Sequence, residues 1–256
     1  MAPAAACAFF RFYAELNDHL PPDQRYQVIA KHFFVAGSVR DMIESLGIPH
    51  TEVDLVLVNG DSADFSRLIK KGDRVSVYPV FEAFDVAPVS RLRPQPLREP
   101  KFVLDVHLGK LAQYLRMLGF DTVYGNRTSD AELVQISVAE KRILLTRDRG
   151  VLKRAAVTHG YWLRETNSRR QAAEVVRRFD LARTLRPFTR CMVCNEPLRQ
   201  ASATEVHLRV PPRALERHDS FQECAVCRRV YWPGSHWQRM AAWIDELSRI
   251  SAQPLH

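Results

Sequence analysis

The C-terminal third of the chain contains two Cys-x-x-Cys pairs, Cys191/Cys194 and Cys224/Cys227, which are separated by 29 residues. Each pair can present two sulfurs to one point, and four thiolates together form a closed tetrahedral site for Zn²⁺. The spacing therefore predicts a zinc ribbon over residues 188–256, in which zinc is a structural cofactor. His207 and His218 lie between the pairs, but four cysteines already complete the coordination.

Two disulfides or a redox dithiol are the alternatives for these cysteines. Disulfides need an oxidising compartment, and residues 1–16 lack the charged stretch and apolar run of a secretory signal. A redox dithiol opens a helix after a strand, whereas Cys191 follows Pro187 and Phe188 in an irregular stretch. We therefore expect a reduced, cytoplasmic protein, and we expect Cys7, in an apolar segment, to be a small buried residue.

Charge is distributed unevenly along the 256 residues, whose net charge is +8. Residues 1–88 contain 8 Lys and Arg against 12 Asp and Glu, whereas residues 89–256 contain 29 against 17. The cationic part favours a phosphate-rich partner, although a basic chain can also be charged for solubility alone. No apolar run approaches the roughly 20 residues of a membrane span, so we expect no membrane contact.

The charge balance changes at a proline-rich stretch, DVAPVSRLRPQPLREP, at residues 85–100. Four prolines in it cannot continue a helix or a central strand, so they favour an extended linker. We place a first domain at residues 1–85 and the linker at residues 86–100.

The first domain has the element order of a β-grasp fold. Its expected strands are residues 6–13, 26–35, 53–58 and 74–81, with a helix capped by Ser38 and Asp41 and a turn at Asn59-Gly60. The segments SLGIP, VLVNG and GDRVSVYP resemble the ubiquitin-like sulfur-carrier family. Those carriers end in Gly-Gly, whereas this chain continues through Val86, so the resemblance implies contact with a protein partner rather than sulfur transfer.

The segment after the linker reads as a parallel α/β fold. Strands are expected at residues 101–106, 121–124 and 142–146. They alternate with a helix whose leucines recur every three or four residues and with a helix at about 130–141, which begins at Ser129-x-x-Glu132. Gly119 is expected to end the first helix. Strands that alternate with helices form a parallel sheet with right-handed crossovers.

Three aspartates fall where such a sheet places functional groups. Asp105 and Asp148 follow the first and third strands, and Asp130 begins a crossover helix that can project to the same edge. Converging carboxylates repel one another unless a hard cation holds them together, and Mg²⁺ or Mn²⁺ prefers oxygen ligands. The pattern predicts metal-assisted hydrolysis of a phosphodiester by activated water.

Basic side chains near these acids are expected to bind substrate phosphates. We assign this role to Lys110 and Arg116 on the first helix and to Arg147 beside Asp148. For Lys110 and Arg116 the alternative is an ordinary charged helix face.

Each aspartate also has a purely structural interpretation. Asp105 can cap the helix that follows it, and Asp130 can interact with the dipole of its own helix. Asp148 can belong to a turn with Arg149-Gly150. All three lie at matching strand or helix ends in a cationic segment, which favours the metal site.

Four segments resemble the Mut7-C family: FVLDVHLGKLAQYLRMLGFDTVYGNRTSDAELVQIS, RILLTRDRGVLKR, PFTRCMVCNEPL and CAVCRRVYWPGSHWQRM. The resemblance covers nearly all of residues 1–240. It implies a PIN-like ribonuclease domain, here residues 101–187, fused to a zinc ribbon and often preceded by a ubiquitin-like domain. It also implies RNA hydrolysis by metal-activated water, with Asp105, Asp130 and Asp148 at the acidic positions. Such sites commonly use four acids, and Glu132 is better explained as the capping partner of Ser129.

Further contacts with RNA are expected from a basic helix over residues 169–186 and from aromatic side chains of the ribbon. Tyr231, Trp232, His236 and Trp237 surround Pro233-Gly234 and can either stack on unpaired bases or pack within the ribbon. Residues 201–219 are expected to form a long loop of the ribbon, and residues 239–250 a helix.

The sequence thus predicts a multidomain α/β and α+β protein with divalent-metal-dependent ribonuclease activity. The alternative is a non-catalytic RNA-binding or adaptor protein that keeps the PIN-like fold.

Overall fold

The computed structural model describes residues 5–79 and 100–251, which form two compact units. The N-terminal unit contains the described residues up to Pro79 together with Ser137–Glu140 and Thr146–Trp162. The C-terminal unit contains Pro100–Ile136, Lys141–Leu145 and the residues from Leu163 onward. The predicted linker, apart from Pro100, lies outside the described residues, and so does the end of the strand predicted at 74–81.

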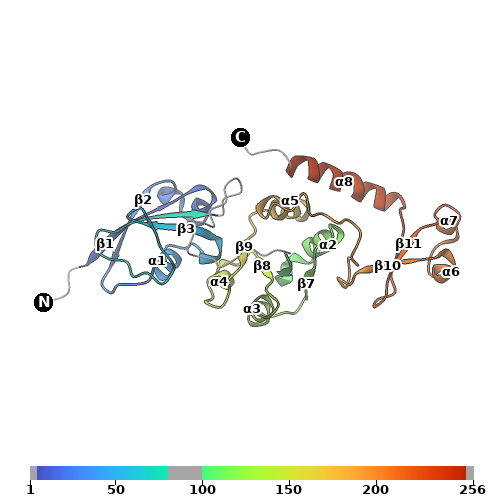
Figure 1. Ribbon diagram of the computed structural model, residues 1–256, viewed down its shortest axis with the longest axis horizontal. Coiled ribbons are helices and arrows are strands. Elements are labelled where there is room, and N and C mark those ends of the chain that lie inside the picture. Colours follow the sequence, from blue (N-terminus) through green and yellow to red (C-terminus); the bar gives the residue numbers. More distant parts are fainter. Residues whose placement is uncertain (1–4, 80–99, 252–256) are drawn as a thin grey trace. The chain divides into compact units, whose positions relative to one another are not determined.

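A five-stranded mixed sheet forms the main layer of the N-terminal unit (Figure 1). The strand order is β2-β1-β5-β3-β4, and β1 pairs antiparallel with β2 and parallel with β5. The fold is the predicted β-grasp arrangement. Its strands are β1 (Ala6–Phe12), β2 (Val28–Phe33), β3 (Val53–Val58), β4 (Asp61–Ser62) and β5 (Arg74–Pro79), and its short 3₁₀ turns are η1 (Ala14–His19), η2 (Pro22–Gln24) and η3 (His50–Glu52).

Helix α1 (Val39–Ser45) packs its apolar face into the core of this sheet, beside Phe10 and Val77. The predicted capping box is present: the Ser38 hydroxyl accepts from the Asp41 N–H at 3.1 Å, and the Asp41 carboxylate accepts from the Ser38 N–H at 3.2 Å. This box satisfies two backbone donors at the helix start and sets where α1 begins.

Two expectations for this domain are wrong in detail. Strand β2 begins at Val28 rather than Tyr26, because Tyr26 has a φ of 59° and its N–H donates to Asn17 Oδ1 at 2.7 Å. A left-handed residue cannot continue a strand. Cys7 is partly exposed rather than buried.

Segment Thr146–Trp162 of the N-terminal unit contains α4 (Arg149–Leu152) and β9 (Gly160–Trp162), which the sequence did not predict. It packs against the β-grasp residues in a contact that we call the N-terminal junction. His50 Nε2 lies 2.7 Å from the carbonyl oxygen of Val157, and Lys153 Nζ donates to the carbonyl of Glu44 at 3.0 Å. Each side of the junction therefore supplies one side chain that contacts a backbone carbonyl of the other side.

A buried contact between a histidine and a carboxylate extends the N-terminal junction. His19 Nε2 lies 2.9 Å from Glu52 Oε2, and Glu52 Oε1 accepts from the Trp162 N–H at 2.7 Å. The Arg149 guanidinium lies 4.6 Å from the centre of the Trp162 indole ring and donates to the carbonyl of His19 at 3.0 Å. Arg149, next to Asp148 in sequence, is thus engaged within this unit.

Three strands of the C-terminal unit form the predicted parallel sheet in the order β7-β6-β8, and β6 is parallel to both β7 and β8. The chain passes from β6 to β7 on one side and then to β8 on the other side, so the sheet order reverses at β6. The remaining elements here are β6 (Phe102–Leu104), η4 (Val106–Leu108), α2 (Gly109–Met117), β7 (Thr122–Tyr124), α3 (Asp130–Ala139), β8 (Ile143–Thr146) and α5 (Ser168–Arg178). Helices α2 and α5 pack side by side (Figure 1).

Local signals set the helix ends as the sequence predicted. Gly119, with a φ of 98°, follows the end of α2, and its close approach to Arg186 leaves no room for a side chain. Glu132 Oε2 accepts from the Ser129 N–H at 2.7 Å, which confirms the capping box of α3.

The basic helix predicted over residues 169–186 is shorter in the structure. Helix α5 ends at Arg178, because Asp180 has a φ of 48° and the chain turns there. Arg178, expected to be available to phosphate, is only 8% exposed. The basic surface is thus smaller than predicted.

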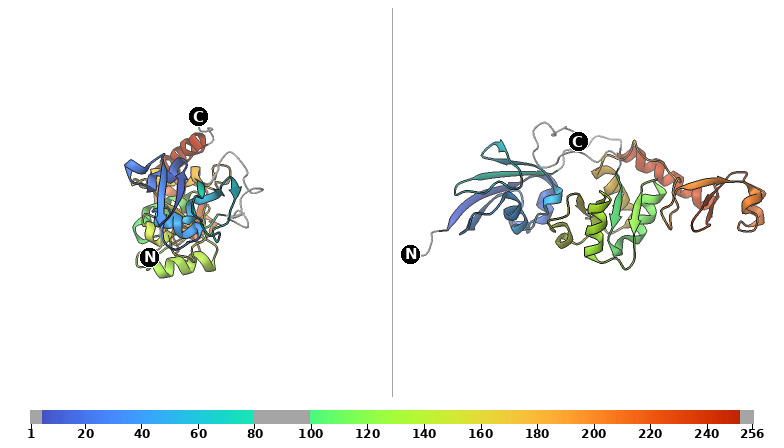
Figure 2. Two further views of the ribbon diagram at one scale, coloured as in Figure 1. Left: turned by 90° about the vertical axis from the view of Figure 1, so that its left-hand side faces the viewer. Right: turned by 60° about the horizontal axis from the view of Figure 1, so that its bottom comes forward.

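The ribbon is a three-stranded antiparallel sheet of β10 (Leu198–Ala201), β11 (Phe221–Cys224) and β12 (Val230–Tyr231), drawn in orange to brown in Figure 2. The predicted loop at 201–219 instead contains α6 (Ala203–Val206) and α7 (Pro212–Leu215). Their side chains build a small core with Phe221, which is why the segment is folded. Helix α8 (Ser235–Ser251) begins four residues earlier than predicted.

Within residues 5–79 and 100–251, no helix combines the length and the apolar character needed to cross a membrane.

Candidate functional site

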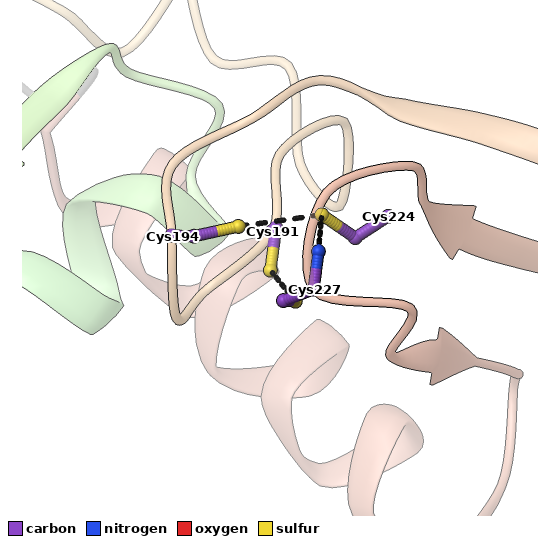
Figure 3. A group of neighbouring side chains, drawn as sticks. All are labelled: Cys191, Cys194, Cys224 and Cys227. Atoms are coloured by element: carbon purple, nitrogen blue, oxygen red, sulfur yellow. Dashed lines mark hydrogen bonds between the residues drawn. The ribbon is translucent and has the colours of Figure 1, made fainter.

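The four predicted zinc ligands converge. The ligand atoms of Cys191, Cys194, Cys224 and Cys227 all lie within 4.8 Å of one another, with 3.3 Å between the sulfurs of Cys194 and Cys224 and 3.5 Å between those of Cys191 and Cys227 (Figure 3). Cys191 and Cys224 are buried. Four sulfurs in this arrangement could bind a structural metal such as zinc.

Two equivalent turns aim these sulfurs. In the first, the Asn195 N–H donates to the carbonyl of Cys191 at 2.9 Å, and in the second the Arg228 N–H donates to the carbonyl of Cys224 at 2.9 Å. Asn195 and Arg228 have φ values of 73° and 61°, and each follows the first cysteine of its pair by four residues. This repeated left-handed position folds each Cys-x-x-Cys stretch into a knuckle.

The environment of Cys191 favours a thiolate, whereas burial raises the pKa of Cys194 to about 12. Burial raises the pKa of Cys191, but hydrogen bonds from the Tyr231 hydroxyl and from the N–H groups of Cys194 and Val193 lower the pKa to about 6. The Tyr231 oxygen lies 3.2 Å from Cys191 Sγ. A thiolate is the form that binds a metal.

Arg116 anchors the first knuckle to the α/β fold, in a contact that we call the C-terminal junction. Its Nη1 donates to the carbonyl of Val193 at 2.6 Å and to that of Met192 at 3.3 Å, and its Nε donates to the carbonyl of Thr122 at 2.9 Å. The side chain is only 5% exposed. The prediction that Arg116 binds substrate is therefore corrected, because a buried guanidinium engaged with three carbonyls is not available to phosphate.

A carboxylate network completes the C-terminal junction. Asp121 accepts from Arg142 at both oxygens, at 2.8 and 3.2 Å, and from the Asn195 side-chain amide at 2.7 Å. The amide oxygen of Asn195 accepts from the Thr122 N–H at 2.9 Å. Burial raises the pKa of Asp121, but the hydrogen bonds from Arg142 and Asn195 lower it by more. The pKa of this carboxyl is therefore below its usual value.

Asp105 follows β6 directly. Its N–H donates to the carbonyl of Leu145 in β8 at 3.1 Å, which continues the parallel pairing, and its Oδ1 accepts from the Val106 N–H at 2.6 Å. The residue is 9% exposed. Asp105 therefore caps η4, as its structural interpretation expected, and it sits at the carboxyl end of the central strand.

The other two acids are exposed. Asp148 follows β8, and its Oδ1 accepts from the Gly150 N–H at 2.7 Å, so it caps α4. Asp130 is the first residue of α3. Lys110 and Arg147, predicted to bind substrate, are exposed as well.

Among the residues that the structure describes, the cysteines are the one group of potential metal ligands whose donor atoms gather within 4.8 Å. The three aspartates do not form such a group. His207 and His218 also lie outside the cysteine group, and His207 Nδ1 is 2.7 Å from the carbonyl oxygen of Thr204.

The sequence did not reveal the residues of the two junctions. The sequence placed Asp121 and Arg142 at the first positions of two predicted strands, and no local pattern links them to Asn195. The one usable signal was that Arg142 directly precedes a buried apolar strand, a position where an arginine needs a partner.

Comparison with family models identifies the family to which both domains belong. Residues 100–244 match the Mut7-C RNAse domain, and residues 5–85 match the Mut7-C ubiquitin domain. The chain belongs to the Mut7-C family, whose RNAse domain suggests a nuclease-like function, and its ubiquitin-like domain suggests interaction with a protein. Comparison with curated proteins and with solved structures found no match.

Proposed function

We propose that this protein is a divalent-metal-dependent ribonuclease in which Asp105, Asp130 and Asp148 bind Mg²⁺ or Mn²⁺. The observation that carries the proposal is topological. Asp105 and Asp148 follow the adjacent parallel strands β6 and β8, beside the point where the sheet order reverses. Ligand and catalytic groups of open α/β sheets gather at this kind of position.

The donor chemistry fits such an ion. The three residues offer only carboxylate oxygens, which Mg²⁺ and Mn²⁺ prefer. Asp105 is 9% exposed, and an ionised carboxylate at that depth needs hydrogen bonds or opposite charge to compensate for lost hydration. The Val106 N–H supplies one such hydrogen bond, and a bound cation would act in the same direction.

The chain's own residues would orient the acids and hold the substrate. The N–H groups of Val106 and Gly150 each fix one oxygen of Asp105 and Asp148, respectively. Lys110 and Arg147 are exposed and are proposed to bind phosphate oxygens. A bound divalent ion would lower the pKa of the attacking water.

The test is cleavage of labelled single-stranded and structured RNAs with Mg²⁺ or Mn²⁺, together with Mn²⁺ binding measured by electron paramagnetic resonance. Asp105→Asn and Asp148→Asn should each slow cleavage about 100-fold or more and weaken Mn²⁺ binding. Asp219→Asn, which changes an exposed aspartate of the ribbon, is the matched control. Residual cutting equal to that of the unmodified chain in both variants would contradict the assigned site.

The second candidate is an RNA-binding or adaptor protein that does not cut. It is favoured by the observation that Asp105 and Asp148 each accept a backbone hydrogen bond at the start of the helix that follows, so each has a structural role of its own. RNA binding that persists in both variants, with no cleavage in either metal by the unmodified chain, would support it.

A further inference from the structure

A groove of about 630 Å³ lies within the C-terminal unit, between α2, the start of α5 and the ribbon. A neighbouring cavity of about 550 Å³ shares part of its ribbon wall, including Tyr231, Trp232 and Met240. The groove includes neither the four zinc ligands nor the three candidate catalytic aspartates, so it is a separate feature of the fold.

One face of α2 forms a side of the groove along the whole helix. The residues of α2 that line the groove recur every three or four positions, which places them on one face of the helix: Lys110, Gln113, Tyr114 and Met117. Leu111 and Leu115, on the opposite face, are fully buried. Nine residues at about 1.5 Å each make α2 about 14 Å long. Lys110 comes five residues after Asp105, so the groove extends from the ribbon toward the end of β6.

The groove is strongly cationic. Among the residues that the structure describes, no aspartate or glutamate lines it, whereas five cations do: Lys110, Arg169, Arg209, Arg228 and Arg229. Two of the arginines are partly neutralised, because Glu223, which is fully buried, accepts from Arg209 at 2.7 Å and lies 3.0 Å from Arg228. Lys110 and Arg229 are exposed, so their charges can meet a ligand's phosphates.

Flat aromatic surfaces accompany these charges. Tyr114, Tyr231 and Trp232 line the groove. Arg169 donates to the Tyr114 hydroxyl at 3.3 Å, and its guanidinium lies 5.8 Å from the ring centre of Trp243 in α8. Aromatic rings and guanidinium planes stack on bases whose faces are uncovered, and a double helix covers those faces.

We propose that this groove binds an unpaired RNA strand, with its phosphates at Lys110 and Arg229 and its bases against Tyr114 and Trp232. The strand then leads along α2 toward Asp105. That the strand is RNA rests on the proposed function, whereas the preference for an unpaired polyanion follows from the groove itself.

The test is equilibrium binding of the full-length, zinc-loaded chain to a fluorescent oligouridylate of about 12 nucleotides, without Mg²⁺ or Mn²⁺. The variants are Lys110→Gln, Arg229→Gln and the double change. Lys101→Gln and Arg213→Gln, at exposed positions outside the groove, are the matched controls. The double variant should raise Kd about tenfold, and each lost cation should lower the salt dependence of log Kd by about 0.7. The controls should bind as the unmodified chain does.

Any of three results would contradict the proposal that this groove binds an unpaired strand. These are groove variants that bind like the controls, a duplex that binds as tightly as the unpaired strand, and polyglutamate that competes as well as RNA. A different result would contradict the proposed ribonuclease function while leaving the binding groove supported. The groove variants would then still lose binding, while the unmodified chain cleaved no RNA with either metal.

Discussion

The N-terminal and C-terminal junctions each attach a small module to a segment of the α/β fold, but with different chemistry. The C-terminal junction relies on arginines and a carboxylate, Arg116 and Arg142 with Asp121, whose charges are constant near neutral pH. The N-terminal junction relies on histidines, with His50 facing a carbonyl and His19 facing a carboxylate. The arginine and carboxylate contacts of the C-terminal junction should therefore be indifferent to pH between about 5 and 8, whereas His50 should make the N-terminal junction respond within that range.

Removal of the metal should have the largest effect and should break only the C-terminal junction. Cys191→Ser removes a ligand from the knuckle whose carbonyls hold Arg116, and structural zinc contributes on the order of 10 kcal/mol to such modules. We expect loss of bound zinc and rapid hydrogen exchange across the ribbon, measured by metal analysis and mass spectrometry. Cys7→Ser is the control and should keep its zinc. One zinc per chain and a protected ribbon in Cys191→Ser would show that the cysteines do not form the site.

Truncation of the buried arginine should be the next largest effect. Arg116→Ala leaves the carbonyls of Thr122, Met192 and Val193 without this donor, so we expect the free energy of unfolding of the C-terminal unit to fall by about 3 kcal/mol. Denaturant titration measures the change, and Arg177→Ala, at an exposed position of α5, is the control. Unchanged stability together with weakened RNA binding would restore the substrate role that the sequence assigned to Arg116.

The carboxylate of the C-terminal junction gives a smaller effect with a defined pH dependence. Asp121→Asn should lower the free energy of unfolding by about 2 kcal/mol at neutral pH, because it weakens the paired hydrogen bonds from Arg142. The pKa of Asp121 lies below its ordinary value of 3.8, so its stabilisation is complete above that pH and is lost as the pH falls through the lowered pKa.

The measurement is the free energy of unfolding as a function of pH, with Asp180→Asn as the control, since asparagine tolerates the left-handed conformation of that residue. A difference between Asp121→Asn and the unmodified chain that is constant down to strongly acidic pH would mean that the charge of Asp121 is not what stabilises the junction.

The smallest expected effect is a pH dependence of stability that comes from His50 in the N-terminal junction. Burial and the nearby Arg40 lower the pKa of His50 below its ordinary value of 6.5, against the opposing effects of Glu44 and Val157. The unfolded chain then binds more protons than the folded one, so stability is complete above pH 6.5 and falls as the pH drops toward the lowered pKa. His50→Gln keeps a donor for Val157 and should remove this pH dependence, whereas His50→Ala should remove it too and should cost about 1 kcal/mol at neutral pH.

Thermal unfolding between about pH 5 and 8 and nuclear magnetic resonance titration of His50 provide the measurement. Greater stability at acidic pH would mean that Glu44, whose carboxylate lies 2.6 Å from His50 Nδ1, holds the charged imidazolium instead.

The elements that the sequence predicted well are those with a local cause. The alternating apolar residues of β1, the capping boxes at Ser38 and Ser129 and the glycine after α2 act within a few residues, and each appears where expected. The cysteine cluster was predictable because a metal site restricts both residue type and spacing. The identity of the three aspartates as one metal site stays a prediction.

What escaped prediction depends on contacts between distant parts of the chain. Arg116 has the helical position of a surface residue, and its role follows only from a knuckle 76 residues away in sequence. Strand β9 is three residues long, and α4 is four, too short for any periodic pattern to appear. The cationic groove likewise combines side chains from α2, α5 and the ribbon that no single motif contains.

The position of Arg116 on α2 has a consequence for the order of synthesis. The chain emerges from its N-terminus, so α2 and β7 are complete before Cys191 and Cys194, and the second cysteine pair follows 29 residues later. Once Met192 and Val193 reach Arg116, the first two sulfurs are already held by a finished surface. A metal at this site would thus first meet half of its ligands, and Cys224, Cys227 and strand β12 would follow to complete the ribbon.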